Sequence, residues 1–198
     1  FHTTYQREII KKKIKEFIEE KVKERKKRHE TYNNTVCISE PDIKESPGGL
    51  RDFHTAMWIS HARFGIRDLN ELCQRGLIDQ EELTLIISAV DFILKIRNEL
   101  HFQAKKKNDL LGYEEQKSIT PVFNFGEVEH FMTEYFRQAR VIQRFSSNVI
   151  KRALKHKKGI VRLFFNKKFR DLPEGFSSSE KEIYIKGFRP DTFKENPL

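Results

Sequence analysis

The chain is poor in cysteine and has no long apolar run, and both shortages limit the class of protein. Its two cysteines, Cys37 and Cys73, form no C-x-x-C pair. A disulfide framework or a zinc site is therefore not expected, and free thiols are typical of a reducing cytosol. No stretch approaches about 18 consecutive apolar residues, which excludes a membrane-spanning helix of ordinary length. The first residues also lack the layout of a signal peptide, so the sequence predicts a cytoplasmic protein without a membrane segment.

Positive charge is in excess, with 38 Lys and Arg against 29 Asp and Glu and a net charge of +9. The densest stretch, residues 11–28, holds ten basic residues and four glutamates. The glutamates stand three or four positions from lysines, which is typical of a solvated helix face. A surface that attracts a partner or a triphosphate is the alternative. Nucleic-acid binding is disfavoured, because no recognised nucleic-acid motif accompanies the charge.

Apolar residues recur at helical spacing over much of the chain. The pattern predicts helices at about 4–31, 50–64, 69–75, 79–104 and 126–157, with a polar, mainly loop connector at 105–125. The last helix has a candidate buried stripe of Val128, Phe131, Met132, Tyr135, Phe136, Ala139, Ile142 and Phe145. Long helices with short links predict an all-α fold, an antiparallel helical bundle.

The tail differs from the rest of the chain. It has strand composition at 160–165 and 182–185, separated by segments that contain proline, glycine and serine, which predicts a small C-terminal β-hairpin. We therefore divide the chain into a linking helix at 1–31, a helical bundle domain at 32–158, and a short β and loop extension at 159–198 that leads toward a downstream domain.

The densest motif is E-P-D-I-K-E-S-P-G-G-L-R-D-F-H-T at residues 40–55. Pro47 fixes its own φ angle, and Gly48 and Gly49 allow φ > 0 and a close approach of the backbone. The helix that follows would present free N–H groups at its first turn, and such an end attracts anions. With Lys44 and Arg51 beside it, the motif predicts a phosphate site.

This segment resembles the E-P-(D/N)-I-K-x-x-P-G-G-L-R-D motif of bacterial PII uridylyltransferase/uridylyl-removing enzymes. Three further stretches, at 64–78, 96–111 and 128–136, are similar to segments of the same family, and the resemblance covers roughly 20–158. In that family a nucleotidyltransferase domain, a helical domain, a metal-dependent HD phosphohydrolase domain and two ACT domains follow one another. The resemblance implies that this chain is the central helical domain.

The catalytic motifs of such enzymes are missing from this chain. A nucleotidyltransferase head needs Gly-Ser followed by Asp-x-Asp, because two carboxylates on one strand must hold the metal ions that bridge the triphosphate. The sequence contains neither pattern, and no His-Asp pair for the phosphohydrolase. We therefore expect no catalytic residue, metal ligand or cofactor here. By resemblance, the intact enzyme would use Mg²⁺ and UTP.

Two groups of residues are candidates for contacts with a nucleotide. In the first, Lys44 and Arg51 would contact phosphate at the turn of Gly48 and Gly49, and Asp52 would hold Arg51 in place. The alternative is a structural ion pair that clamps the glycine turn to the bundle.

The second group is Arg97, His101 and Asp109. Arg97 and His101 share one face of a helix, at i and i+4, and could converge with Asp109 on one site. A histidine satisfied within the core is the alternative. Trp58 is expected to be a core anchor without a ligand.

The resemblance also implies a function. The intact enzyme would transfer UMP from UTP to a tyrosine of the signalling protein PII in nitrogen regulation, and would remove it when glutamine is abundant. The helical domain would help to form the nucleotide cleft and to seat PII, beside its own nucleotidyltransferase and HD domains. The alternative is a non-catalytic interaction module of a nucleotidyltransferase-like signalling protein with CBS or cyclic-nucleotide domains.

Overall fold

A computed structural model of the chain describes residues 2–155, 176–179 and 182–185. The chain divides into two compact units, 1–155 and 156–198. The first unit is helical and contains both groups of candidate residues. None of the described helices is long and apolar enough to cross a bilayer.

Six α-helices and one 3-10 helix make up the described part of the first unit. They are α1 (His2–Glu30), α2 (Leu50–Phe64), α3 (Leu69–Gln74), α4 (Gln80–Ala104), α5 (Tyr113–Ile119), η1 (Thr120–Phe123) and α6 (Val128–Lys155). The prediction of a mostly helical chain is confirmed. The connector at 105–125 is not mainly loop as predicted, because α5 and η1 lie within it. Gln116 stabilises α5 by donating to the carbonyl oxygens of Ser39, at 2.6 Å, and Leu111, at 2.9 Å.

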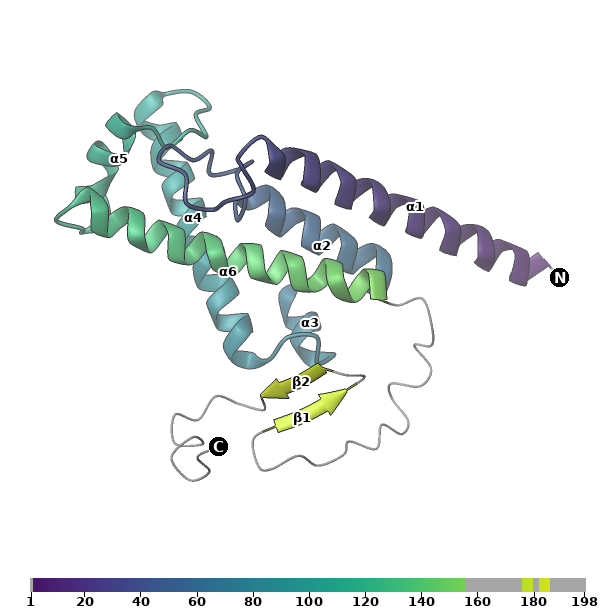
Figure 1. Ribbon diagram of the computed structural model, residues 1–198. Helices are drawn as coiled ribbons and strands as arrows, with labels where there is room; N and C mark the ends of the chain where they lie inside the picture. The colour runs from purple at the N-terminus through teal and green to yellow at the C-terminus, as the bar shows by residue number, and fades with distance from the viewer. Residues whose placement is uncertain (1, 156–175, 180–181, 186–198) are drawn as a thin grey trace. The chain divides into compact units, whose positions relative to one another are not determined.

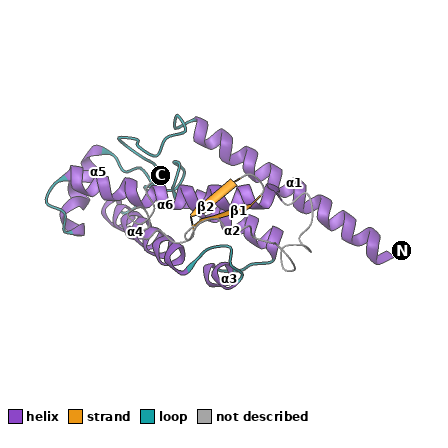
Figure 2. Ribbon diagram, turned by 60° about the horizontal axis from the view of Figure 1, so that its bottom comes forward, coloured by secondary structure: helices purple, strands orange, loops and turns teal. Residues whose placement is uncertain are grey.

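The helices do not form the simple antiparallel bundle that the sequence predicts. Figure 1 shows that α1 is antiparallel to α2, whereas α2 and α6 are parallel and α4 crosses them. The parallel pair is evident from its contacts, since Gly48 lies against Ala139 and Phe53 against Phe145. The chain can return to the same end because α3, α4 and α5 lie between α2 and α6 in the sequence. Figure 2 shows the same crossing of α4 from another side.

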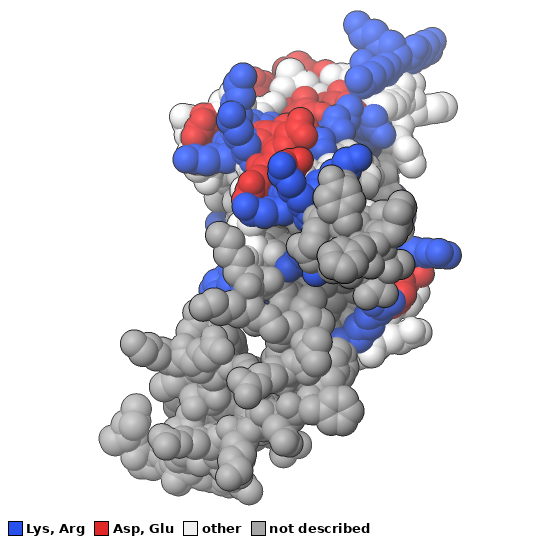
Figure 3. Space-filling view, turned by 90° about the vertical axis from the view of Figure 1, so that its right-hand side faces the viewer, with Lys and Arg blue, Asp and Glu red and all other residues white. Residues whose placement is uncertain are grey.

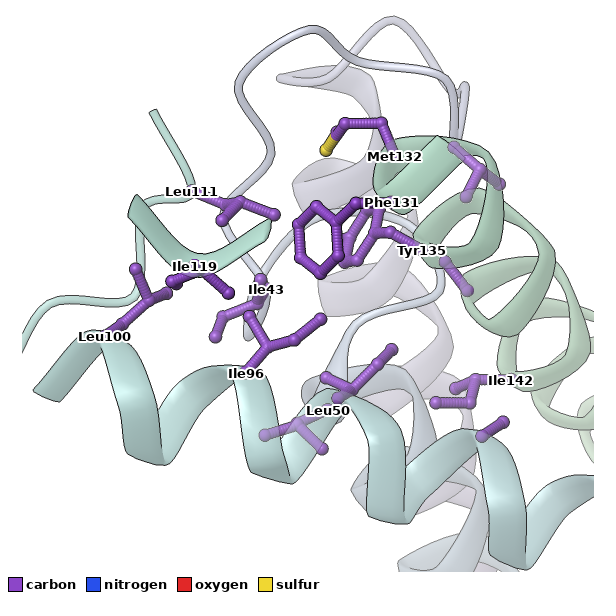
Figure 4. Close-up of a cluster of buried hydrophobic side chains, with 14 residues drawn as sticks. Ile43, Leu50, Ile96, Leu100, Leu111, Ile119, Phe131, Met132, Tyr135 and Ile142 are labelled. Atoms are coloured by element: carbon purple, nitrogen blue, oxygen red, sulfur yellow. The ribbon is translucent and has the colours of Figure 1, made fainter. Parts of the chain in front are cut away.

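Two groups of buried apolar side chains hold the unit together. The first lies among α4, α6 and the loop before α2, with Ile43, Leu50, Ile96 and Tyr135 at its centre (Figure 4). The second joins α1, α2, α3, α6 and the first half of α4. Most of the stripe predicted for α6 is buried, as expected from its helical spacing: Phe131, Met132, Tyr135, Ala139, Ile142 and Phe145.

The first half of α1 extends beyond the other helices (Figure 1). Ile10 is exposed there, whereas Ile18, two turns later, is buried against the second group. Lysines and glutamates along this helix pair at i,i+4, as in Lys15 with Glu19 at 3.5 Å. Figure 3 views the molecule from this end and shows Lys and Arg side chains beside Asp and Glu side chains. The arrangement is that of a solvated helix face whose lysines are in part paired with glutamates.

The predicted hairpin of 160–165 with 182–185 is not supported. Its first strand lies outside the described residues. In the second unit, β1 (Phe176–Ser179) pairs with β2 (Glu182–Ile185) in antiparallel register, with Phe176 opposite Ile185 and Ser179 opposite Glu182. Residues 177–179 therefore belong to a strand and not, as the sequence predicts, to the link between strands.

Candidate functional site

The double glycine is a point where the backbone approaches two other segments. Gly48 has φ +80°, and a Cβ on it would overlap the carbonyl oxygen of Ala139 in α6. A Cβ on Gly49 would stand 2.8 Å from the carbonyl oxygens of both Ile43 and Lys44. Glycine is therefore required at both positions, at Gly48 by its left-handed conformation as well as by space.

The first turn of α2 has no free amide for an anion, so this part of the predicted phosphate site is wrong. The N–H groups of Leu50 and Arg51 donate to the carbonyl oxygens of Ile43 (3.1 Å) and Lys44 (2.8 Å). The N–H of Gly48 donates to the carboxylate of Asp52 at 3.0 Å. The physical reason is that the preceding loop curls back and offers its own carbonyl oxygens as the helix cap.

Asp52 is the fully buried centre of an ion cluster. Its carboxylate accepts from His29 Nε2 at 2.9 Å, from Arg25 Nε at 3.3 Å and from Arg28. Burial by itself would raise the pKa of Asp52. The hydrogen bond from His29, the charges of Arg25 and His29, and the N–H of Gly48 outweigh it and hold the pKa below its ordinary value.

The predicted role of Asp52 is therefore corrected. It does not hold Arg51, because its partners come from α1 and from the glycine turn. The alternative, a structural cluster that clamps the turn to the bundle, describes its geometry. The side chains of Arg25 and Arg28 are 16% and 11% exposed, so α1 is joined to α2 through charges that are largely withdrawn from water.

The partners of Asp52, which are Arg25, Arg28 and His29, were not predicted from the sequence. A signal for them is nevertheless present in the sequence. The face of α1 that carries Ile14, Ile18 and Val22 continues at positions 25, 28 and 29 with cationic side chains. Where a buried helical stripe changes from apolar to basic side chains, the facing element is expected to supply a buried acid, because buried charges need a partner.

Arg51 pairs with Glu45 rather than with Asp52. Its Nη2 lies 3.0 Å from Glu45 Oε1, and Lys44 Nζ lies 3.6 Å from the same oxygen. Burial would raise the pKa of Glu45, but Arg51, Arg28 and Lys44 together lower it, so the carboxylate is ionised at neutral pH. The side chains of Lys44 and Arg51 are 25% and 29% exposed. These side chains, and not the helix amides, are the groups at this turn that an anion could reach.

The structure brings the second predicted group together. Arg97 Nε donates to Asp109 Oδ1 at 2.8 Å, and His101 Nε2 lies 2.9 Å from the same oxygen. The Arg97 and His101 side chains are 29% and 31% exposed. The alternative of a histidine within the core is therefore wrong. Burial would raise the pKa of Asp109, but its interactions with Arg97 and His101 lower it.

The two groups lie close to each other through the backbone. The N–H of Ile43 donates to the carbonyl oxygen of Asp109 at 2.8 Å, and the N–H of Leu111 donates to that of Pro41 at 2.9 Å. This short bridge places Asp109 beside the segment that carries Lys44. The two candidate sites predicted separately are therefore neighbours.

Trp58 is not the core anchor that the sequence predicts, since it is 39% exposed. Lys21 Nζ lies 5.5 Å from the centroid of its ring, and Arg51 Cζ lies 6.0 Å from it. The imidazole of His54 stacks against it with centroids 5.9 Å apart. In the described part of the chain, no three His, Cys, Asp or Glu side chains form a group that could hold a metal ion.

Comparison with known proteins identifies relatives for most of the chain. The family model described as GlnD PII-uridylyltransferase matches residues 16–150. A protein of Aliivibrio fischeri (strain MJ11) named bifunctional uridylyltransferase/uridylyl-removing enzyme is 36% identical over 140 residues, which cover 68% of this chain and 16% of that protein. No solved structure matches significantly.

Two relatives with the same name match nearly the whole chain. The protein of Pseudomonas aeruginosa (strain LESB58) is 30% identical over 190 residues, or 93% of this chain and 21% of its own length. The protein of Hydrogenovibrio crunogenus is 31% identical over 192 residues, which cover 92% of this chain and 21% of that protein. The chain thus spans about a fifth of the length of the relatives that it matches. With a family model covering more than half of its residues, this chain belongs to the GlnD PII-uridylyltransferase family.

Proposed function

We propose that this chain is the helical domain of a bifunctional PII uridylyltransferase/uridylyl-removing protein. In the intact cytoplasmic enzyme it would stand beside a nucleotidyltransferase domain and an HD domain, and the enzyme would transfer UMP from UTP to PII. The observation that carries this proposal is the family match over residues 16–150, which includes both groups of candidate residues. The names of the relatives describe both the transfer and the removal.

The domain would help to form the nucleotide cleft and to seat PII. Asp52 locks α1 and the glycine turn to α2, and the backbone of Arg51 is bonded to that of Lys44 at 2.8 Å. Two cationic side chains therefore project from a turn whose backbone cannot easily move. A fixed pair of cations is suited to orienting a triphosphate, because little conformational entropy is lost when the anion binds.

Mg²⁺ does not fit the described residues. The carboxylates that would be needed, those of Glu45, Asp52 and Asp109, are each bonded to arginine side chains. The metal ion expected for the intact enzyme would therefore be held by another domain. The contribution proposed for this chain is restricted to binding and orientation.

The experiment uses the full-length gene product, incubated with PII, UTP and Mg²⁺ and followed by intact-mass measurement of PII. We expect a mass gain of one UMP per modified PII subunit. The 198-residue chain alone should give no gain, since it lacks the Gly-Ser and Asp-x-Asp patterns. An unchanged PII mass with the full-length protein would refute the proposal and favour a non-catalytic interaction module. A gain with the 198-residue chain alone would contradict the assignment of catalysis to another domain.

A further inference from the structure

His54 belongs to neither group of candidate residues, but the charges of Arg51 and Arg97, one from each group, act on it. It lies one helical turn after Arg51 on α2, and it is exposed to solvent. Its ring stacks at 25° against Trp58, with centroids 5.9 Å apart, and lies 5.8 Å from the ring of Phe53. The imidazole is therefore held in place at the surface.

Hydrogen bonds connect the cations around His54 into one arrangement. The N–H of Arg51 donates to Lys44, and the N–H of the adjacent Ile43 donates to Asp109. The carboxylate of Asp109 in turn holds Arg97 at 2.8 Å. We call the surface formed by Lys44, Arg51, His54 and Arg97 the basic face.

The electrostatic surroundings of His54 are positive. Its partial burial lowers the pKa of the imidazole, and the nearby charges of Arg51, Arg97 and Lys44 lower it further. The acids nearest to these cations are Glu45 and Asp109. Each of them accepts hydrogen bonds from an arginine and offsets part of the positive charge, but the cations still outweigh the acids at His54, whose pKa is lowered.

The neighbouring part of α1 does not reverse this balance. Lys21 lies over the Trp58 ring, and its ammonium group also pairs with Glu24 at 2.6 Å. The net positive charge at His54 therefore comes from α2, α4 and the loop before α2.

We propose that the basic face binds a phosphoanion, the diphosphate or triphosphate group of a nucleotide, with His54 as a ligand beside Lys44, Arg51 and Arg97. The inference rests on the proposed nucleotide cleft and adds to it two residues from the α2–α4 side. Arginine presents N–H groups in a fork that matches phosphate oxygens. A bound anion would also offset the repulsion among these cations.

The same geometry predicts recognition of the phosphates and not of the base. Lys21 and Arg51 already lie over the ring of Trp58, at 5.5 and 6.0 Å from its centroid, and His54 stacks against it. A base would have to displace these groups in order to stack. We therefore expect pyrophosphate, UTP and CTP to bind this face with similar affinity.

Binding should be linked to protonation of His54. The anion stabilises the imidazolium, so the pKa of His54 rises when the anion binds. By linkage, affinity increases as the pH falls through that pKa. Replacement of His54 by glutamine removes this part of the pH dependence and leaves the part that belongs to the phosphate itself.

The experiment is an NMR titration of the imidazole resonances of the 198-residue chain with pyrophosphate in metal-free buffer. The resonance of His54 is assigned by its loss in His54→Gln. We expect its pKa to rise by at least half a unit at saturation. The resonance of His130, an exposed histidine on α6, serves as an internal control and should not respond.

Variants give the matched comparison. Arg97→Ala should weaken pyrophosphate binding at least fivefold, whereas Arg137→Ala, which removes another exposed arginine that pairs with a glutamate, should not change it. The proposal is overturned if His54 does not respond, if His130 responds equally, or if the face binds an acidic peptide but not pyrophosphate. Because no transfer is measured, failure here is distinct from failure of the PII reaction in the full-length protein.

Discussion

Asp52 shows how one buried carboxylate can determine the geometry of a surface turn. It accepts hydrogen bonds from the Gly48 amide and from three side chains of α1. Removing one partner of a buried cluster is costly, because the remaining charges stay withdrawn from water without their counterion. The cluster is expected to hold the turn and α1 together as one element.

Asp52→Asn should lower the free energy of unfolding by about 3 kcal/mol at neutral pH, near the lower end of the range for buried pairs, because Arg25 and Arg28 retain some exposure. Urea denaturation measures it. The matched control is Asp91→Asn, which breaks a pair with Lys95 whose side chains are 58% and 64% exposed. That variant should have little effect. Equal losses in the two variants would refute a special role for Asp52.

The difference in unfolding free energy between wild type and Asp52→Asn should depend on pH in a definite direction. The pKa of Asp52 is lower in the folded than in the unfolded chain, where it is about 3.9. Its contribution is therefore complete above about pH 4 and is lost as the pH falls through the folded value. The gap in unfolding free energy between wild type and Asp52→Asn should narrow in acid. A gap that is constant from pH 7 to pH 3 would contradict the lowered pKa.

At the scale of elements, the contact between the glycine turn and α6 fixes where α2 begins. Gly48 combines φ +80° with a position against the Ala139 carbonyl oxygen. Gly65, which ends α2, has a similar φ of +70°, but no heavy atom of the described chain lies within 4 Å of a Cβ placed on it. A comparison of the two glycines therefore distinguishes the cost of a left-handed backbone, which both share, from the cost of a steric clash, which only Gly48 has.

Gly65→Ala should cost about 1 kcal/mol, the penalty for a left-handed backbone. Gly48→Ala should cost at least about 2 kcal/mol more, because it adds a clash that only movement of α6 can relieve. Thermal melting followed by circular dichroism compares them. If the two variants melt at the same temperature, the close approach of the turn to α6 is wrong.

The helices could be predicted from the sequence because periodicity reports which face is buried. The stripe of α6, from Phe131 to Phe145, is a direct consequence of this. The sequence could not predict that the first amides of α2 are already hydrogen-bonded. Their acceptors are the backbone carbonyl oxygens of Ile43 and Lys44, whose position depends on the path of the loop. Residue type carries no information about that path.

The same limit applies to single side chains. An isolated tryptophan among apolar residues favours the core, yet Trp58 lies at the surface, where Lys21, Arg51 and His54 contact its ring. Convergence of Arg97, His101 and Asp109 could be predicted, because a helix face and a nearby acid suffice to suggest it. The pairing of Glu45 with Arg51 depends on the turn and was missed.

At the scale of the whole molecule, Asp52 joins helices, whereas Arg51 is a proposed phosphate contact. The two residues are adjacent in sequence, but they have different partners. Asp52 is buried and joins two helices, whereas Arg51 is partly exposed and pairs with an acid of the loop before α2. Loss of Arg51 should therefore leave the fold nearly intact, since an ion pair that water still reaches contributes little to stability.

The most direct test is UMP transfer to PII by full-length Arg51→Ala, expressed per folded molecule, with Arg137→Ala as the control. We expect Arg51→Ala to reduce transfer at least tenfold with a melting temperature within a few degrees of wild type, and Arg137→Ala to change neither quantity. If Arg51→Ala lowers the melting temperature markedly and leaves transfer per folded molecule unchanged, Arg51 is a structural residue and the account is contradicted.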